Sequence, residues 1–204
     1  SVIYDGVRAE LYQSRYVTRR DKLRMIFLGG YAKSKGQEDL IEALKNLSQE
    51  LKNQFEIDFY GNGSEEYIKY LKAKIEKNEL SEVMKLHSYQ HDIWKKVPQY
   101  DIGLNCSHGE GFGRVTVEYM MAGLCPVASD GGATSEIIEN GKTGILYEAL
   151  NRAALRDVII WTINNQKSIR KSGENAVKSA RCKFSMEKHA KEIKKLYYEV
   201  TEDV

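Results

Sequence analysis

The sequence predicts an α/β domain in which about six mostly parallel strands form a sheet flanked by helices. Short apolar runs rich in strand-forming residues alternate with amphipathic helical patterns over residues 23–147. Glycine-containing loops follow these runs, and the pattern after residue 147 is helical. Such alternation is typical of βαβ units with right-handed crossovers. The loops after the strands then share one rim of the sheet, where ligands bind in such folds.

Periodicity along the chain sets the range of each element. The predicted strands are 23–28, 55–60, 83–86, 101–105, 125–128 and 144–147. Helical spacing of apolar residues between them predicts helices at 37–51, 65–78, 92–97 and 114–122. Three further helices are expected at 150–165, 166–181 and 185–200. The last begins after a break at Phe184, with Ser185 in a position to cap it.

Composition favours one globular domain in a reducing compartment. A length of 204 residues allows one well-buried core. The 31 Lys and Arg against 29 Asp and Glu give a net charge of +2, too balanced to indicate a nucleic-acid partner. Cys106, Cys125 and Cys182 form no C-x-x-C pair, and three cysteines cannot all pair within one chain, which favours the cytoplasm. No apolar run reaches the roughly 18 to 20 residues of a membrane helix.

Glycine-rich segments after the strands each have a functional and a plain structural interpretation. In 29–36, Lys33 and Lys35 precede a helix and can pair with phosphate oxygens, although loop lysines are usually only solvated. Segment 61–66 resembles a dinucleotide fingerprint, but Glu66 replaces its third glycine, so a tight turn is favoured over a dehydrogenase site. Segment 129–136 fits an anion-binding nest or a capped turn.

Metal and hydrolase sites have little support in the sequence. His87 and His91 are four residues apart, but they straddle a predicted strand end and lack an H-E-x-x-H motif. No G-x-S-x-G elbow and no P-loop is present. His108 lies on the rim without a defined partner, and we therefore expect no bound metal.

The segment 110–118 carries the most information. Glu110 and Glu118 flank a glycine-rich loop that enters a predicted helix. The first amides of a helix lack intrahelical acceptors, and the helix dipole adds positive potential, so a phosphate can dock there. Taken alone, the spacing fits equally well a βα turn in which Glu110 complements the helix dipole.

Six motifs in order and spacing resemble the C-terminal, nucleotide-sugar-binding half of GT-B retaining glycosyltransferases of family 4, the glycosyl transferases group 1. The resemblance covers nearly the whole chain. The matching segments are 2–7 (I-x-N-G-V, with Asp5 for Asn), 29–36 (G-R-x4-K-G), 101–107 (A-D-v-x-v-x-P-S, without the Pro), 110–127 (E-x7-E, then E-A-M-a-x-G-x-P-V), 136–144 (E-i-i-x-x-g-x-T-G) and 184–185 (F-S).

The resemblance implies a Rossmann-like domain and a role for each matched residue. Glu110 would lie by the donor sugar as the catalytic residue, Glu118 would hold the ribose hydroxyls, and Lys35 would bind the diphosphate. The other implied donor-binding residues are Gly29, Gly30, Gly111, Phe112, Gly113 and Arg114, with Ser88 and Tyr89 at the base. The donor would be a nucleotide-diphosphate sugar, with no cofactor. Glu110 as nucleophile and same-face attack through an oxocarbenium-like state both remain open.

One position departs from the family pattern. The diphosphate-binding Arg of the family falls at Gly30, which carries no charge. Arg114 or Lys33 would have to take its place. The family's glycine pair also aligns either with Gly131 and Gly132 or with Gly132 and Ala133, so roles in that loop stay unassigned.

We therefore expect a linker at 1–20, a nucleotide-sugar-binding domain at 21–183, and a helix at 184–204 that crosses to a missing N-terminal acceptor-binding domain or packs on the core. The implied reaction is hexosyl transfer to a glycan or lipid-linked acceptor in bacterial cell-surface polysaccharide synthesis. The full-length enzyme would be cytoplasmic or peripheral on the inner face of the membrane, and this fragment alone would turn over poorly or not at all. The alternatives are a non-catalytic nucleotide-sugar-binding module and another GT-B enzyme, such as an epimerase or phosphorylase.

Overall fold

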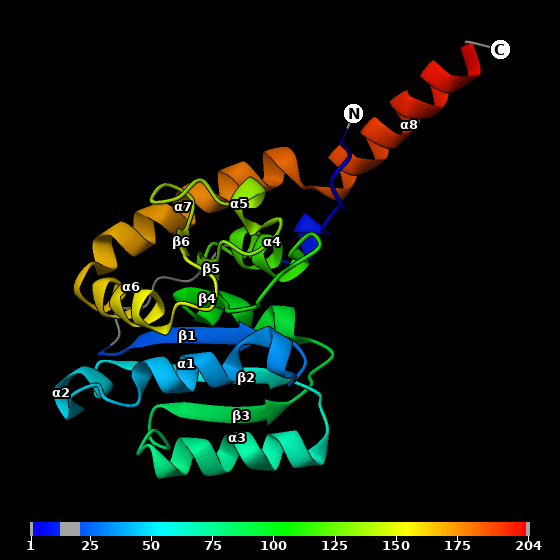
Figure 1. Ribbon diagram of the computed structural model, residues 1–204. Coiled ribbons are helices and arrows are strands. Elements are labelled where there is room, and N and C mark those ends of the chain that lie inside the picture. The colour runs from blue at the N-terminus through cyan, green and yellow to red at the C-terminus, as the bar shows by residue number, and fades with distance from the viewer. Residues whose placement is uncertain (1, 13–20, 203–204) are drawn as a thin grey trace.

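A computed structural model describes residues 2–12 and 21–202. Parts of the predicted end segments, namely residues 1, 13–20, 203 and 204, lie outside the described residues. The predicted fold class is confirmed, because six parallel strands form one sheet in the order β3-β2-β1-β4-β5-β6 (Figure 1). The strands are β1 Leu23–Leu28, β2 Phe55–Gly61, β3 Met84–Ser88, β4 Ile102–Asn105, β5 Cys125–Ser129 and β6 Ile145–Tyr147.

The helices occupy the expected regions between and after the strands. The α-helices are α1 Gln37–Leu44, α2 Gln49–Lys52, α3 Glu65–Lys77, α4 Arg114–Met121, α5 Thr134–Ile137, α6 Arg152–Asn164, α7 Gln166–Lys183 and α8 Met186–Glu202. Short 3₁₀ turns lie at η1 Ala9–Leu11, η2 Lys33–Lys35, η3 Ile93–Lys95 and η4 Val97–Gln99.

The two faces of the sheet bury separate apolar layers. Along β1, Met25 and Phe27 pack in one layer with residues of α1, α3 and α6, whereas Ile26 packs in the other with residues of α4 and α7. This alternation follows from the period of two along a strand. The sheet is therefore covered on both faces, and the loops that carry the predicted motifs lie at its carboxyl edge.

Tyr119 fixes the helix that follows the 110–118 motif. Its ring packs against Gly103 of β4, where a Cβ atom would lie 2.1 Å from the ring. Its hydroxyl accepts a hydrogen bond from the Leu28 amide (2.7 Å) and donates one to the Leu104 carbonyl (3.2 Å). Because both contacts lie at the ends of central strands, the N-terminus of α4 is held at the rim.

Two predicted helices differ from those observed. The continuous pattern at 37–51 splits into α1 and α2, because the Ser48 hydroxyl accepts the Leu51 amide (3.4 Å) and caps a new helix. The pattern at 92–97 forms the two 3₁₀ turns η3 and η4, with Pro98 at the start of the second. Both regions are short, so tertiary contacts and capping outweigh helix propensity there.

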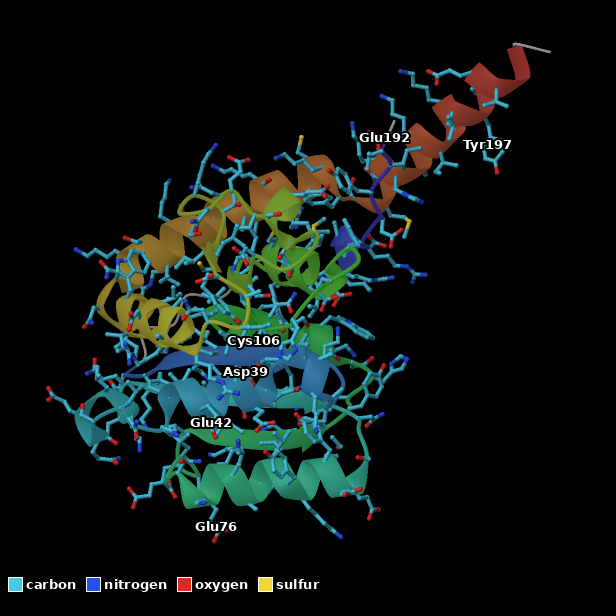
Figure 2. All side chains as sticks on the ribbon, viewed as in Figure 1. Asp39, Glu42, Glu76, Cys106, Glu192 and Tyr197 are labelled. Atoms are coloured by element: carbon cyan, nitrogen blue, oxygen red, sulfur yellow. The ribbon has the colours of Figure 1, made fainter. Side chains whose placement is uncertain are left out.

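Helix α8 projects away from the sheet and begins beside the N-terminal segment (Figure 1). The Val7 amide donates to the Phe184 carbonyl (2.8 Å), and the Met186 amide donates to the Val7 carbonyl (3.1 Å). Ser185 caps α8 as predicted, since its hydroxyl accepts the Lys188 amide (3.2 Å). Tyr197, on the projecting part of this helix, is 70% exposed (Figure 2). Over residues 2–12 and 21–202, every helix is too short or too polar to cross a membrane.

The three cysteines lie in different environments. Cys106 and Cys125 are buried, whereas Cys182 near the end of α7 is exposed, and none of the three forms a disulfide in the part of the chain that the structure describes. Burial raises the pKa of the Cys106 thiol to about 12.

The cap of α3 gives a stability test of the fold. The Ser64 hydroxyl accepts the Tyr67 amide (3.2 Å). We expect Ser64→Ala to lower the free energy of unfolding by about 1 kcal/mol in urea denaturation, because the amide loses its acceptor. Ser168→Ala is the control, since Ser168 is exposed within α7 and alanine favours the helix there. Equal stabilities of the two variants would contradict this role of Ser64.

Candidate functional site

A cleft of about 1060 Å³ opens at the carboxyl edge of the sheet. Its walls come from the turns after β1 and β2, the loop after β3, the exposed side of α4 and the N-terminal segment. The residues that define it include Arg8, Tyr12, Gly29, Gly30, Tyr60, Asn62, Tyr89, His91, Trp94, Arg114 and Glu118. Its volume suits a nucleotide-sized ligand, as pockets for such ligands are typically several hundred Å³ or more.

Close contact between two turns forms the floor of the cleft. A Cβ atom on Gly61 would lie 1.9 Å from the Gly29 carbonyl oxygen, so glycine is required at that position. Gly30 is different, because a Cβ atom there would meet nothing closer than the Asn62 carbonyl oxygen at 3.4 Å. The cleft therefore has room for a side chain at Gly30.

Helix α4 contributes one acidic and one basic side chain to the cleft. Gly113 adopts φ 81° before the helix begins, which directs the first amides of α4 to the rim. The Arg114 Nε atom donates to Glu118 Oε1 (3.2 Å). Burial raises the pKa of the Glu118 carboxyl, and the Arg114 charge and a hydrogen bond from Tyr12 only partly offset this effect.

Lys35 and Glu110 form an ion pair at the same rim, although neither is among the residues that line the cleft. The Lys35 Nζ atom lies 2.8 Å from Glu110 Oε1, and the Ser107 hydroxyl donates to the same oxygen (2.6 Å). The Ala133 amide donates to the Glu110 carbonyl (3.1 Å), which joins this loop to the 129–136 segment. Lys35 and Glu110 lie 75 residues apart in sequence and meet through the sheet topology.

The predicted donor-binding residues fall into three groups. Gly29, Gly30, Tyr89, Arg114 and Glu118 line the cleft. Lys35 and Glu110 form the pair beside it, and Gly111 and Gly113 lie in the loop between Glu110 and α4. Phe112 instead packs against Tyr4 (5.9 Å between ring centroids) and Phe184, whereas Ser88 ends β3 in an exposed position outside the lining.

Several residues that line the cleft were not predicted as site residues from the sequence. Tyr12 and Arg8 come from the N-terminal segment, and Trp94 comes from a region expected to be helical. Tyr60 and Asn62 flank the end of β2, where only a tight turn was predicted. The glycines at 61 and 63 were the one sequence signal for this wall, because they allow the turn after β2 to lie close to the turn after β1.

His87 and His91, which the sequence gave little reason to regard as metal ligands, contact different carboxylates in the structure. His87 Nε2 lies 2.5 Å from Asp58 Oδ1, and its ring stacks on Tyr60 with centroids 4.5 Å apart. His91 Nδ1 lies 3.0 Å from Asp92 Oδ1. His87 therefore supports the ring of Tyr60, which forms part of the cleft wall.

In folds of this class, a glycine-lined cleft at the carboxyl edge of a parallel sheet, beside a helix N-terminus, is the typical position for binding anionic ligands such as nucleotides. Residues 10–179 match the family Glycosyl transferases group 1. This match covers most of the 204 residues, and the chain belongs to that family.

Curated relatives extend well beyond the region that this chain covers. An uncharacterised glycosyltransferase of Methanocaldococcus jannaschii is 29% identical over 202 residues, which make up 98% of this chain and 54% of that protein. The N-acetyl-alpha-D-glucosaminyl L-malate synthase of Bacillus anthracis is 24% identical, with the same coverage of the two chains. The chain therefore spans about half the length of these curated relatives.

Solved structures share the fold at low sequence identity. Anabaena HepE in complex with UDP-glucose superposes with a TM-score of 0.85 at 24% identity, covering 98% of this chain and 57% of that one. The C-terminal domain of a glycosyl transferase group 1 protein from Francisella tularensis gives a TM-score of 0.78 at 22% identity. That match covers 89% of this chain and 100% of the other, so the fold is that of a C-terminal GT-B domain.

Proposed function

We propose that the cleft binds the nucleotide-diphosphate sugar donor of a retaining hexosyltransferase. The observation that carries this proposal is the convergence of the Gly29–Gly30 turn, Arg114 and Glu118 on one cleft in a chain of this family. Glu118 would accept hydrogen bonds from the ribose hydroxyls, and Tyr89 would contact the base, since both residues line the cleft. UDP-sugars are the first donors to test, because the structurally similar HepE binds UDP-glucose.

The Lys35–Glu110 pair would act at the reacting end of the donor. Negative charge grows on the diphosphate as the glycosidic bond breaks, and Lys35 together with the amides before α4 would stabilise it where it develops. Glu110 would lie by the sugar, either as the nucleophile or as a group that stabilises the positive sugar during same-face attack. Lys35 Nζ lies 2.8 Å from Glu110 Oε1, and because an ammonium group has three donors, it would contact the diphosphate while it keeps this pair.

The acceptor would bind to a separate N-terminal domain, since this chain spans only about half the length of its curated relatives. A GT-B enzyme aligns donor and acceptor between two domains, and that alignment makes the transfer effectively intramolecular. We therefore propose that this chain binds nucleotide but transfers sugar very slowly. The full-length enzyme would act in the cytoplasm on a glycan or lipid-linked acceptor, with peripheral membrane association supplied by the N-terminal domain.

Isothermal titration calorimetry of the chain with UDP-, GDP- and ADP-sugars tests donor binding directly. We expect saturable binding of one nucleotide class and competition by its free nucleoside diphosphate. Binding that depends on the base would support the assignment, and the absence of binding to all three classes would refute it. Full-rate glycosyl transfer by this chain would refute the need for a second domain.

Arg114 is the proposed substitute for the charge missing at Gly30. Arg114→Ala is expected to lower UDP affinity about fivefold, because one charge-assisted contact to the diphosphate is lost. Calorimetry at low salt measures the change, and Arg156→Ala on the outer side of α6 is the matched control. Unchanged affinity in Arg114→Ala would leave Lys33 as the alternative cation.

A further inference from the structure

Asp39 joins three elements behind the candidate donor site. It is the third residue of α1, and its side chain is 15% exposed. His108 Nε2 lies 2.7 Å from Asp39 Oδ2, and Arg152 Nε donates to Asp39 Oδ1 (2.7 Å). Both carboxylate oxygens are therefore occupied by groups from other segments, one from the loop after β4 and one from the first turn of α6.

The loop that Asp39 holds is the one that carries Glu110. It starts at Cys106, whose thiol has a pKa raised mainly by burial and to a smaller extent by the charge of Asp39. The His108 amide donates to the Ser34 carbonyl (2.9 Å), so the loop also contacts the turn that contains Lys35. A Cβ atom on Gly36 would lie only 2.0 Å from the Cys106 carbonyl oxygen, which shows how closely the loop and turn approach.

Further contacts hold this loop from the β5 side, in addition to the Lys35–Glu110 pair and the His108–Ser34 hydrogen bond on the α1 side. The Ser129 hydroxyl donates to the Ser107 carbonyl, and the Ala133 amide donates to the Glu110 carbonyl (3.1 Å). These contacts anchor the loop toward β5, whereas the His108–Asp39 contact anchors it toward α1. Asp39 itself does not line the donor cleft, so it acts on a donor only through the loop.

We propose that Asp39 is a positioning residue that places Glu110 by holding His108, with Arg152 orienting the carboxylate. This assignment rests on the proposed function, in which Glu110 lies by the donor sugar. A carboxylate with both oxygens engaged has a fixed orientation, and hydrogen bonds to a charged group are the stronger ones in proteins. The tie therefore favours one position of the Glu110 loop over the alternatives open to a segment without regular structure.

Hydrogen exchange tests the tie without any ligand. In Asp39→Asn we expect amide exchange within 106–113 to rise at least fivefold, while the exchange of β1 and β4 stays unchanged. Asp157→Asn is the control, because it removes an exposed carboxylate that pairs with Arg156 on α6. Unchanged exchange in 106–113 would overturn the proposal. If Asp39→Asn fails to fold, the comparison of His108→Gln with His108→Ala replaces it: the amide NH₂ of Gln can restore the contact, so only Ala should raise the exchange.

A double-mutant cycle separates positioning from general support of the fold. With the donor found by calorimetry, we expect Asp39→Asn to weaken nucleotide-sugar binding about fivefold in the wild-type background and less than twofold in a Glu110→Gln background. Affinity for the free nucleoside diphosphate should change less than twofold. Equal losses in both backgrounds would overturn the positioning role. If no nucleotide sugar binds to the wild-type chain, the proposed function fails, and the exchange experiment still decides whether Asp39 holds the loop.

Discussion

Glu118→Gln is expected to remove most of the preference of this domain for UDP over a UDP analogue that lacks the 2′ and 3′ hydroxyl groups. A carboxylate that accepts hydrogen bonds from both hydroxyls contributes about 1.5–3 kcal/mol for each, and an amide replaces only part of this. We expect UDP affinity to fall roughly 10- to 100-fold. Calorimetry with UDP and with 2′,3′-dideoxy-UDP makes the comparison, and Glu118→Gln should lower the affinity for UDP much more than the affinity for the dideoxynucleotide.

The comparison of the two nucleotides is not affected by the loss of the Arg114–Glu118 ion pair. Replacing Glu118 frees the arginine, which changes the affinity for both nucleotides through their shared diphosphate. The ratio of the two affinities therefore reports on the hydroxyl contacts. Equal losses for UDP and dideoxy-UDP would show that Glu118 does not bind the ribose.

Glu118→Gln lowers nucleotide affinity, but it should raise the free energy of unfolding relative to the wild type at neutral pH. Burial raises the pKa of Glu118 in the folded state. The protonated carboxyl therefore contributes to the free energy of unfolding fully below the pKa of the unfolded chain, and this contribution is lost as the pH rises through the pKa of the folded protein. The ionised carboxylate is thus the unfavourable form in the folded protein. Glu118→Gln should therefore be more favourable for stability, relative to the wild type, at pH 7 than at pH 4.5. Urea denaturation at the two pH values measures this difference.

Gly30→Arg is expected to raise UDP affinity about tenfold at low salt. The cleft has space at this position, since a Cβ atom would find its nearest neighbour at 3.4 Å and the backbone of Gly30 does not adopt a positive φ. A guanidinium group can form two parallel hydrogen bonds with phosphate oxygens. The gain should shrink as ionic strength rises, because salt screens exposed charges.

Two controls separate a specific contact from a general effect of charge. Gly30→Met fills the same space without charge and should bring no gain. Gly109→Arg adds the same charge on another rim loop where a Cβ atom meets no neighbour, and Gly109 does not line the cleft. An equal gain in Gly109→Arg would mean that Gly30 does not face the diphosphate.

The strands and the rim were predictable because their signals are local. Apolar runs such as 23–28 and 55–60 are bounded by turns, and parallel strands bring their following loops to one edge. The 110–118 segment could be placed before a helix because glycine precedes the helical pattern. Helix 37–51 was predicted too long because Leu44, Leu47 and Leu51 keep helical spacing across the break, while the Ser48 cap decides the observed ends.

Contacts between distant segments could not be predicted from these patterns. Asp39 and His108 are 69 residues apart, and neither lies in a motif that indicates the other. Tyr12 hydrogen-bonds Glu118 from the N-terminal segment that lines the cleft, and the sequence of that segment has no periodic signal. Each of these contacts depends on the tertiary course of the chain, which propensity and spacing do not specify.

The distribution of the cysteines makes the protein suited to labelling at one site. Thiol reagents react with the thiolate, so Cys106 is protected both by its burial and by its high pKa, and Cys125 is protected by its burial. Cys182 is exposed and lies four residues before α8 begins. A fluorophore attached there, at the end of α7, would mark the junction with the projecting helix α8 without any substitution in the sequence.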